Sequence, residues 1–473
     1  MKQGLFRLAL CLLAASCSRE EPNAFTTDAD WPTPPSVMES SRDLIVVTVD
    51  TLRADRLPFY GGERPLAGEA SDPWSLAWMA QQGTLLEDAQ AHVGVTLPSL
   101  ASFWTGLEPL EHGALSNRSK VTGLTYVMKL RRQGWHGVGA VANGILRIGS
   151  GINRGFKEYL AFPDTEEAAL TDYLLEQAAS KLDDQEPLLL WAHYMAPHQP
   201  YAPPAKHLGR YSTSDGPPGT NETLFALHQD PKQLTPHVES HLKGLYDEEI
   251  LAVQEEVQRL LLGLEEQYQA AGRGSLLENA VVIFASDHGE ELGDRHGYFM
   301  HAKSLYAGVT QVPVLVLGQD WPAQRLPWPI GLKEVLPWVI EGITPDDGQV
   351  VSALKDKYYV LRNRDWTLVH NPRADGSSPG GPPPGSQYPY PTVALFSRGQ
   401  DRLELEDRSA EFPEVTKKML DALQQWHFAL PLPSEENLSG VDRALLDSLG
   451  YANQGDGQEQ MPPPWSGEEW NPH

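Results

Sequence analysis

The stretch Asp43-Leu44-Ile45-Val46-Val47-Thr48-Val49-Asp50 decides the fold that the sequence predicts. Its nearly uninterrupted apolar, β-branched run is typical of a parallel strand that is buried on both faces. The stretch Ala280-Val281-Val282-Ile283-Phe284-Ala285-Ser286-Asp287 repeats the pattern. Taken singly, an aspartate at a strand end is more commonly a cap or turn residue. Because open α/β sheets bind ligands at the carboxyl ends of their parallel strands, we expect Asp50 and Asp287 to face a ligand site together.

The rest of the chain alternates between short apolar runs that predict strands and amphipathic stretches that predict helices. We expect further strands at 137–142 and 188–194, helices at 76–83, 124–133, 170–182 and 246–267, and a long surface loop over 199–240. This order predicts an α/β protein with a doubly wound sheet. After about residue 345 we expect strands at 357–361 and 366–369 and a terminal helix at 412–428, which form a smaller α+β subdomain. The expected domains are a main α/β domain at 42–345, a C-terminal subdomain at 346–451 and a disordered tail at 452–473.

The bulk composition limits the classes of partner. The 473 residues carry 37 basic and 63 acidic side chains, for a net charge of −26, and 41% of the residues are hydrophobic. This balance argues against nucleic acid as a partner, because the phosphate backbone is bound by basic surfaces. An anionic substrate stays compatible with it, since a bound metal or a lysine can set the local field.

The N-terminus predicts export. Lys2 and Arg7 precede an apolar run from Leu8 to Ala15 that is too short to span a bilayer. The sequence then reads Ala15-Ser16-Cys17 and resembles a bacterial lipoprotein signal, with Cys17 as the lipidated residue. A plain secretory signal is the alternative. We expect a signal peptide at 1–17, a proline-containing tether at 18–41, and a bacterial cell-envelope lipoprotein that touches the membrane only through its lipid anchor.

The segment Val95-Thr96-Leu97-Pro98-Ser99-Leu100-Ala101-Ser102-Phe103-Trp104-Thr105-Gly106 predicts a short helix. Pro98 suits a first-turn position, and Gly106 suits the end of a helix. Thr96 is then expected just before the first turn, where free N–H groups and the helix dipole favour an anion. An ordinary threonine N-cap is the alternative reading of an isolated segment of this kind.

Four side chains from these segments could form one metal site. Asp50, Asp287, His288 and the Thr96 hydroxyl offer hard oxygens and one imidazole, a set that suits zinc or manganese better than calcium. A divalent metal would lower the pKa of the Thr96 hydroxyl and polarise a substrate oxygen.

Several motifs occur in the order found in one family. The runs 49–61, 96–106 and 286–313 resemble the signature segments of the sulfatase family in the alkaline phosphatase superfamily, and 191–201 resembles its strand-end histidine segment. The resemblance covers roughly residues 43–451 and implies an alkaline-phosphatase-like fold. It also implies roles for single residues: Asp50, Asp287 and His288 as metal ligands, Thr96 as nucleophile, Lys303 and His198 at the reacting group, and His193 and His301 as weaker substrate-binding candidates. Each histidine alone is more commonly an ordinary hydrogen-bonded residue.

Departures from the family pattern indicate the chemistry. Thr96 stands where sulfatases have the cysteine or serine that is oxidised to formylglycine, and Leu100 and Thr51 replace an arginine and a second aspartate. The run 141–146 lacks the lysine and histidine expected there. A formylglycine hydrate expels sulfate by collapsing to the aldehyde, whereas a threonine ester must be cleaved by water. Phosphorus accepts such attack readily, so we expect phosphoester chemistry to be favoured.

Three functions therefore compete. The first is a metal-dependent hydrolase of sulfate or phosphate esters with Thr96 as covalent nucleophile, acting on an anionic ester such as a glycan, lipid or nucleotide headgroup. The second is a non-catalytic surface-binding protein on the same scaffold, which the substituted positions motivate. The third is a phospho-group transferase, since the Thr, Asp and His set also resembles phosphoethanolamine and lipoteichoic-acid transferases. A second metal, held by histidines such as His296 and His301, is left open.

Overall fold

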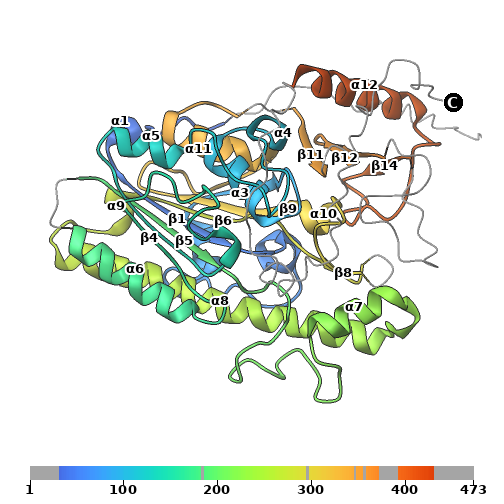
Figure 1. Ribbon diagram of the computed structural model, residues 1–473, viewed down its shortest axis with the longest axis horizontal. Coiled ribbons are helices and arrows are strands. Elements are labelled where there is room, and N and C mark those ends of the chain that lie inside the picture. The colour runs from blue at the N-terminus through green and yellow to red at the C-terminus, as the bar shows by residue number, and fades with distance from the viewer. Residues whose placement is uncertain are drawn as a thin grey trace, which may run out of the picture.

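A mixed eight-stranded sheet forms the centre of the protein (Figure 1). The computed structural model describes residues 31–182, 186–294, 298–345, 348–354, 358–371 and 392–430. The strand order is β10-β2-β9-β6-β1-β5-β3-β4. The strands are β1 (Asp43–Val49), β2 (Thr84–Gln90), β3 (His136–Val141), β4 (Glu158–Ala161), β5 (Leu188–Tyr194), β6 (Ala280–Ser286), β9 (Gln311–Leu317) and β10 (Gln324–Gly331). All pairs are parallel except those of β9, which runs antiparallel to both β2 and β6.

Strand β1 lies in the middle of the sheet, where its mostly apolar side chains are buried on both faces. All seven of its residues are buried. It pairs in parallel with β5 on one side and β6 on the other, and Val49 is level with both Tyr194 and Ser286. Since the register is fixed in this way, the residues that follow β1 and β6 leave the sheet at the same edge.

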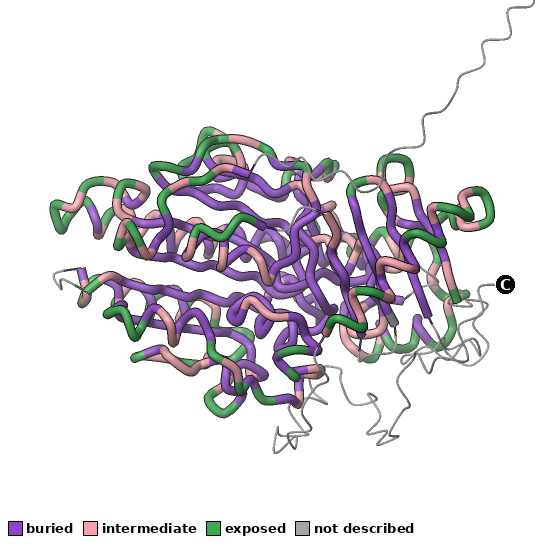
Figure 2. Tube along the Cα trace, turned by 90° about the horizontal axis from the view of Figure 1, so that it is seen from above, coloured by how far each residue is buried: buried purple, intermediate pink, exposed green. Residues whose placement is uncertain are grey.

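Helices cover both faces of the sheet, as expected for a doubly wound fold (Figures 1 and 2). On one side lie α6 (Glu167–Lys181) and the long α8 (Pro236–Ala270), which run beside each other below the strands in Figure 1. On the other side lie α3 (Thr96–Thr105), α5 (Tyr126–Arg132) and α11 (Leu332–Glu341). Smaller helices are α1 (Val37–Ser40), α2 (Leu76–Gln82), α4 (Pro109–His112), α9 (Leu276–Asn279) and α10 (Ala307–Thr310), with 3-10 turns at Ala54–Arg56, Pro58–Tyr60 and Gly144–Leu146.

Helix α3 begins one residue earlier than the sequence indicated. Thr96 is its first residue, Val95 occupies the N-cap without a side-chain hydrogen bond, and the expectation that Thr96 precedes the first turn is wrong. The cap comes from elsewhere, because Asn117 Oδ1 accepts a hydrogen bond of 2.9 Å from the Leu97 N–H. Gly106 ends the helix in the left-handed conformation, with φ of 74°, as its position predicted.

The expected surface loop over 199–240 is partly helical. It contains α7 (Asn221–Gln229), a 3-10 turn at Pro231–Gln233 and the first residues of α8. Threonine caps explain both helix starts: Thr220 Oγ1 accepts from Thr223 N, and Thr235 Oγ1 accepts from Val238 N, with Pro236 as the first residue of α8. The many proline and turn residues of this stretch predicted a loop, whereas here they mark helix boundaries.

A small antiparallel sheet and one helix form the C-terminal subdomain (Figure 1). Its strands are β11 (Val350–Leu354), β12 (Tyr358–Arg362), β13 (Trp366–His370) and β14 (Val393–Ser397), in that order, and α12 (Pro413–Ala429) packs on them. A hairpin of β7 (Glu291–Leu292) and β8 (Phe299–Met300) follows β6. The domain boundaries expected from the sequence stay predictions.

No helix among the described residues is long and apolar enough to cross a membrane. Cys17, the signal peptide, His296 and the tail at 452–473 lie outside the described residues.

Candidate active site

Four residues that are distant in sequence meet at the carboxyl edge of β1 and β6. Thr96 Oγ1 lies 3.4 Å from Asp50 Oδ2 and 3.4 Å from His288 Nε2. His288 Nε2 in turn lies 3.5 Å from Asp287 Oδ2 and 3.8 Å from Asp50 Oδ1. None of the four side chains is more than 1% exposed. The structure therefore brings together all four residues that we predicted to hold a metal.

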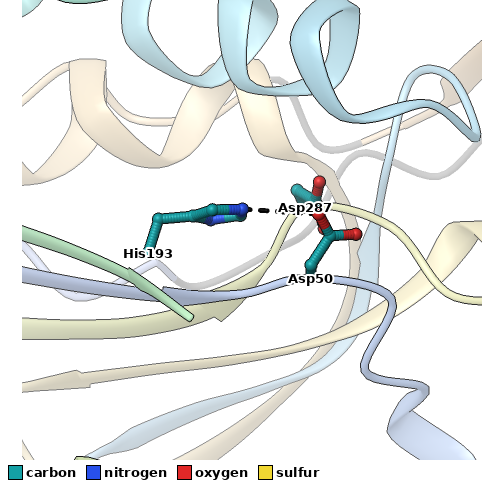
Figure 3. A group of neighbouring side chains, drawn as sticks. All are labelled: Asp50, His193 and Asp287. Atoms are coloured by element: carbon teal, nitrogen blue, oxygen red, sulfur yellow. Dashed lines mark ion pairs between the residues drawn. The ribbon is translucent and has the colours of Figure 1, made fainter. Parts of the chain in front are cut away.

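His193 joins this group from β5 (Figure 3). Its Nε2 atom lies 3.4 Å from Asp50 Oδ2, and ligand atoms of Asp50, His193 and Asp287 all lie within 4.8 Å of one another. The family resemblance suggested only a substrate-binding role for His193. Its position makes it an additional candidate metal ligand.

The hydrogen bonds behind the two histidines fix which nitrogen faces the site. Thr48 Oγ1 is 2.8 Å from His193 Nδ1, accepts a bond of 2.9 Å from Trp191 Nε1 and lies 3.2 Å from the Ala192 carbonyl oxygen. All partners are satisfied when Nδ1–H donates to Thr48 and the Thr48 hydroxyl donates to Ala192. His288 Nδ1 likewise donates to the Gly289 carbonyl at 2.9 Å. Both rings then present the Nε2 lone pair to the carboxylates.

Such a cluster of acceptors fits a cation. Within the described part of the chain, Asp50 Oδ1, Asp287 Oδ2 and His193 Nε2 are buried atoms without a hydrogen-bond partner. Buried carboxylates and imidazole lone pairs that face one another without donors are costly, and a divalent ion removes that cost. The residues present therefore fit the binding of a metal.

The charges of the site are set by burial and by neighbours. Burial raises the pKa of Asp50, but the contact with His193 and the charges of His198 and His288 outweigh it and hold the pKa below its ordinary value. The pKa of Asp287 is raised well above its ordinary value by burial and by the charge of Asp50. Burial lowers the pKa of His288. Asp50 is therefore charged at the expense of protons on the neighbouring histidines, which burial disfavours. A bound cation would take the place of those protons and keep both carboxylates charged beside neutral imidazoles.

Backbone and side-chain contacts hold the two carboxylates in place. Asn143 Nδ2 donates to Asp50 Oδ2 at 2.7 Å, and Ser99 Oγ donates to the Asp287 carbonyl at 2.6 Å. Thr51 N–H donates to Asp287 Oδ1 at 3.3 Å from a left-handed conformation with φ of 55°. Asn143 therefore supports the first aspartate from the region where the family pattern has a lysine and a histidine.

A second group of buried side chains lies beside the first. The rings of His301 and His288 are 4.6 Å apart between centroids, and those of His198 and His301 are 4.9 Å apart. His301 Nδ1 lies 3.2 Å from Glu290 Oε1. Burial lowers the pKa of His198, whose Nδ1 donates to the Gln199 carbonyl, so the uncharged ring presents Nε2. Burial and two neighbouring histidines lower the pKa of His301 far below its ordinary value.

Lys303 follows His301 on the same segment. Its side chain is half-buried, burial lowers its pKa, and its Nζ atom lies 5.8 Å from the centroid of the Tyr298 ring. The family resemblance implies that Lys303 binds the reacting group, and this role stays a prediction.

The sequence did not indicate which residues orient the candidate ligands His193 and Asp50. Thr48 was one polar residue within a buried apolar strand, and Trp191 and Asn143 were quoted only as parts of motifs. The polar side chain two residues before the strand-end aspartate was the signal that could have found Thr48, because a hydroxyl on a fully buried strand must find a partner.

Comparison with known families agrees with this geometry. The family model described as Sulfatase matches residues 42–333. The chain belongs to the sulfatase family. Members of this family generally bind a divalent metal, and the Asp50, His193 and Asp287 group is a candidate site for it here. No curated protein sequence matches this sulfatase-family chain.

Solved structures show the same fold at low sequence identity. A protein from Bacteroides fragilis described as a sulfatase superposes with a TM-score of 0.62 at 17% identity, covering 81% of this chain and 95% of that chain. The phosphonate monoester hydrolase of Agrobacterium radiobacter superposes with a TM-score of 0.60 at 15% identity, covering 82% and 95%. A 2-O glycosaminoglycan sulfatase, BT1596, gives 0.60 at 14% identity, covering 81% and 91%. The alkaline-phosphatase-like fold with a small C-terminal subdomain is thus confirmed.

Proposed function

We propose that this sulfatase-family protein is a metal-dependent ester hydrolase that uses Thr96 as its covalent nucleophile. The observation that carries the proposal is the position of Thr96 Oγ1, 3.4 Å from both Asp50 Oδ2 and His288 Nε2 at a buried cluster of metal-ligand type. Asp50, Asp287, His288 and His193 would hold the cation. A bound divalent metal supplies a lower hydroxyl pKa and stabilises charge that develops on the substrate.

The side chains of the protein perform the remaining steps. In the first step, the bond from Thr96 Oγ1 to phosphorus or sulfur forms while the bond to the leaving alcohol breaks. The Thr96 hydroxyl releases its proton to solvent, and His198, on the opposite side of the reacting atom, donates a proton from Nε2 to the leaving oxygen. In the second step water attacks from the side of His198 and gives its proton to that ring, the bond from Thr96 Oγ1 to phosphorus or sulfur breaks, and Thr96 regains a proton from solvent. Lys303 binds the non-bridging oxygens.

We infer that phosphate, phosphonate or other phosphorus esters are better substrates than sulfate esters. Thr96 cannot form the formylglycine hydrate, so water must attack the phosphorus or sulfur atom of the threonine ester directly. One structural neighbour is a phosphonate monoester hydrolase. Other neighbours favour a glycan carrier, since one was solved with D-glucosamine-2-N,6-O-disulfate and another with a neocarrahexaose. We propose an anionic ester on a glycan, lipid or nucleotide headgroup, zinc or manganese as the metal, and lipid anchoring of the exported protein through Cys17.

Substitution of the nucleophile tests this function. We expect Thr96→Ala to lower the turnover of p-nitrophenyl phosphate, bis-p-nitrophenyl phosphate and p-nitrophenyl sulfate on the order of a thousandfold or more. Thr96→Ser, which keeps the hydroxyl, should retain measurable turnover, and acid-quenched wild type should carry the transferred group on Thr96. Metal analysis of each sample shows whether the cation site survives. Undiminished hydrolysis by Thr96→Ala, or a wild type that binds no divalent metal, would refute the proposal.

A further inference from the structure

We propose that Arg362 and Glu404 of the C-terminal subdomain are positioning residues that hold the Lys303 segment, residues 301–307, against the active site. The inference rests on the proposed role of Lys303 in binding the anionic group. It assigns a function to the subdomain that neither the family match nor the structural neighbours provide.

The two residues form a buried pair that contacts the segment at two backbone positions. Arg362 Nη2 donates to the Leu305 carbonyl at 2.7 Å, and the Ala307 N–H donates to Glu404 Oε2 at 2.8 Å. Arg362 Nε and Nη2 each donate to Glu404 at 3.1 Å. The side chains of Arg362 and Glu404 are only 1% and 3% exposed. The guanidinium and the carboxylate thus hold each other and grip the backbone that follows Lys303.

The backbone before Lys303 is held by the other domain. The Ala302 N–H donates to the Gly94 carbonyl at 3.0 Å, and Gly94 lies two residues before Thr96. Ala302 has φ of 70°, a conformation that a residue with a side chain adopts only when its surroundings require it. A Cβ atom on Gly94 would lie 3.2 Å from the Ser304 carbonyl oxygen, so the two backbones touch. Lys303 is therefore held between the start of the Thr96 helix and the C-terminal subdomain.

A buried charge pair of this kind is better explained by positioning than by stability. Removing two charges from water is costly, and apolar replacements of buried ion pairs are often neutral or stabilising. Docking of the subdomain has a separate ion pair, because Arg398 Nη1 and Nη2 contact Asp88 on β2 and Arg398 Nη1 also donates to the Asn363 carbonyl at 2.7 Å. That pair makes no hydrogen bond to residues 301–307 among the described contacts. The charge of Arg398 also acts on Arg362 and Glu404, so Arg398→Lys, which keeps that charge and removes only the forked contact to Asp88, is the control for Arg362→Lys.

The experiment compares Arg362→Lys and Glu404→Gln with Arg398→Lys. Lysine keeps the charge of Arg362 but cannot reach Glu404 and Leu305 together, and glutamine keeps the shape of Glu404 without its charge. We expect both variants to raise KM for bis-p-nitrophenyl phosphate about tenfold, as partial loss of one charge-assisted hydrogen bond would do, with kcat changed less than about threefold. The inhibition constant of inorganic phosphate should rise in parallel. In Arg398→Lys, which keeps the positive charge near Glu404 and leaves the contacts to Leu305 and Ala307 in place, both constants should stay within about twofold of wild type.

Hydrogen exchange gives a readout that does not depend on turnover. We expect the amides of 302–307, Ala307 above all, to exchange about tenfold faster in Arg362→Lys and Glu404→Gln, with the β1 amides unchanged. Equal effects of Arg398→Lys on KM, or unchanged exchange at 302–307 in the other two variants, would overturn the positioning role. If wild type hydrolyses none of the esters, the proposed function fails, while hydrogen exchange still decides whether the pair holds the segment.

Discussion

Replacing Thr48 with valine tests the orientation of His193 in the site. Thr48→Val keeps the shape of the side chain and removes only the hydroxyl that contacts Trp191 Nε1 at 2.9 Å and His193 Nδ1 at 2.8 Å. Both ring N–H groups are buried, so each would be left without its acceptor. A buried unsatisfied donor costs about 1–3 kcal/mol. We therefore expect Thr48→Val to lower the free energy of unfolding by ~2–6 kcal/mol and to leave a folded protein, given the usual stability of about 5–15 kcal/mol.

The same change should weaken metal binding, because His193 loses the partner that fixes its Nε2 lone pair toward Asp50. Loss of such support typically costs about 10–100-fold in metal affinity. Isothermal titration of the metal-free protein with zinc and with manganese measures this change, and urea unfolding measures the stability. Thr48→Ser is the control, since it keeps the hydroxyl and loses only a methyl group, worth about 0.8 kcal/mol. An unchanged metal affinity in Thr48→Val would show that His193 is not a ligand.

Three further predictions concern the metal, the pH dependence and the helix end. Asp50→Asn should abolish binding of one divalent ion per chain and the rise in Tm that the metal gives to wild type, as measured by titration and thermal unfolding; a rise in Tm as large as that of wild type would contradict this. Burial, with the charges of Glu167 and Glu248, raises the pKa of Glu249 to about 8, so the native state holds a proton that the unfolded chain releases near pH 4.5. Glu249 therefore makes the free energy of unfolding fall as pH rises from about 4.5 to 8, by up to about 1.4 kcal/mol per pH unit. Urea unfolding at several pH values should show a flatter slope for Glu249→Gln than for wild type. An identical slope in the two proteins would contradict this prediction. Gly106→Ala should lower the free energy of unfolding by about 1 kcal/mol or more in the same assay. The reason is that Gly106 has a φ of 74° and that a Cβ atom there would lie 3.2 Å from Pro337 Cγ. An unchanged free energy of unfolding would show that the turn relaxes freely.

Much of the fold followed from hydrophobic pattern alone. The buried strands β1, β5 and β6 were predicted because an unbroken, short β-branched run with a polar end fits a buried parallel strand and few other elements of structure. The pattern did not indicate that β9 runs antiparallel between β2 and β6, since strand direction depends on how the connections cross the sheet. It also gave no sign of α7, whose start is set by a threonine cap within a stretch rich in turn residues.

The sequence predicted those metal-ligand candidates whose position in a strand or helix is visible in the local sequence. Asp50 and Asp287 are recognisable because they end strands, and Thr96 because it precedes a proline and an apolar run. His193 was undervalued because its partners, Thr48 and Asp50, are neighbours only after β1 and β5 pair. Arg362 and Glu404 carried no local signal, because their contacts to residues 305 and 307 exist only when two separate sheets have formed and docked.

The pairing of β5, β1 and β6 ties the cation site to completion of the whole domain. Thr96 and His288 stand 192 residues apart along the chain, so no fragment can assemble the site before the central strands are in register. An ion that binds only the finished domain favours it by mass action. The supply of metal in the surroundings would then govern how long each molecule resists unfolding and proteolysis, as well as whether it can react.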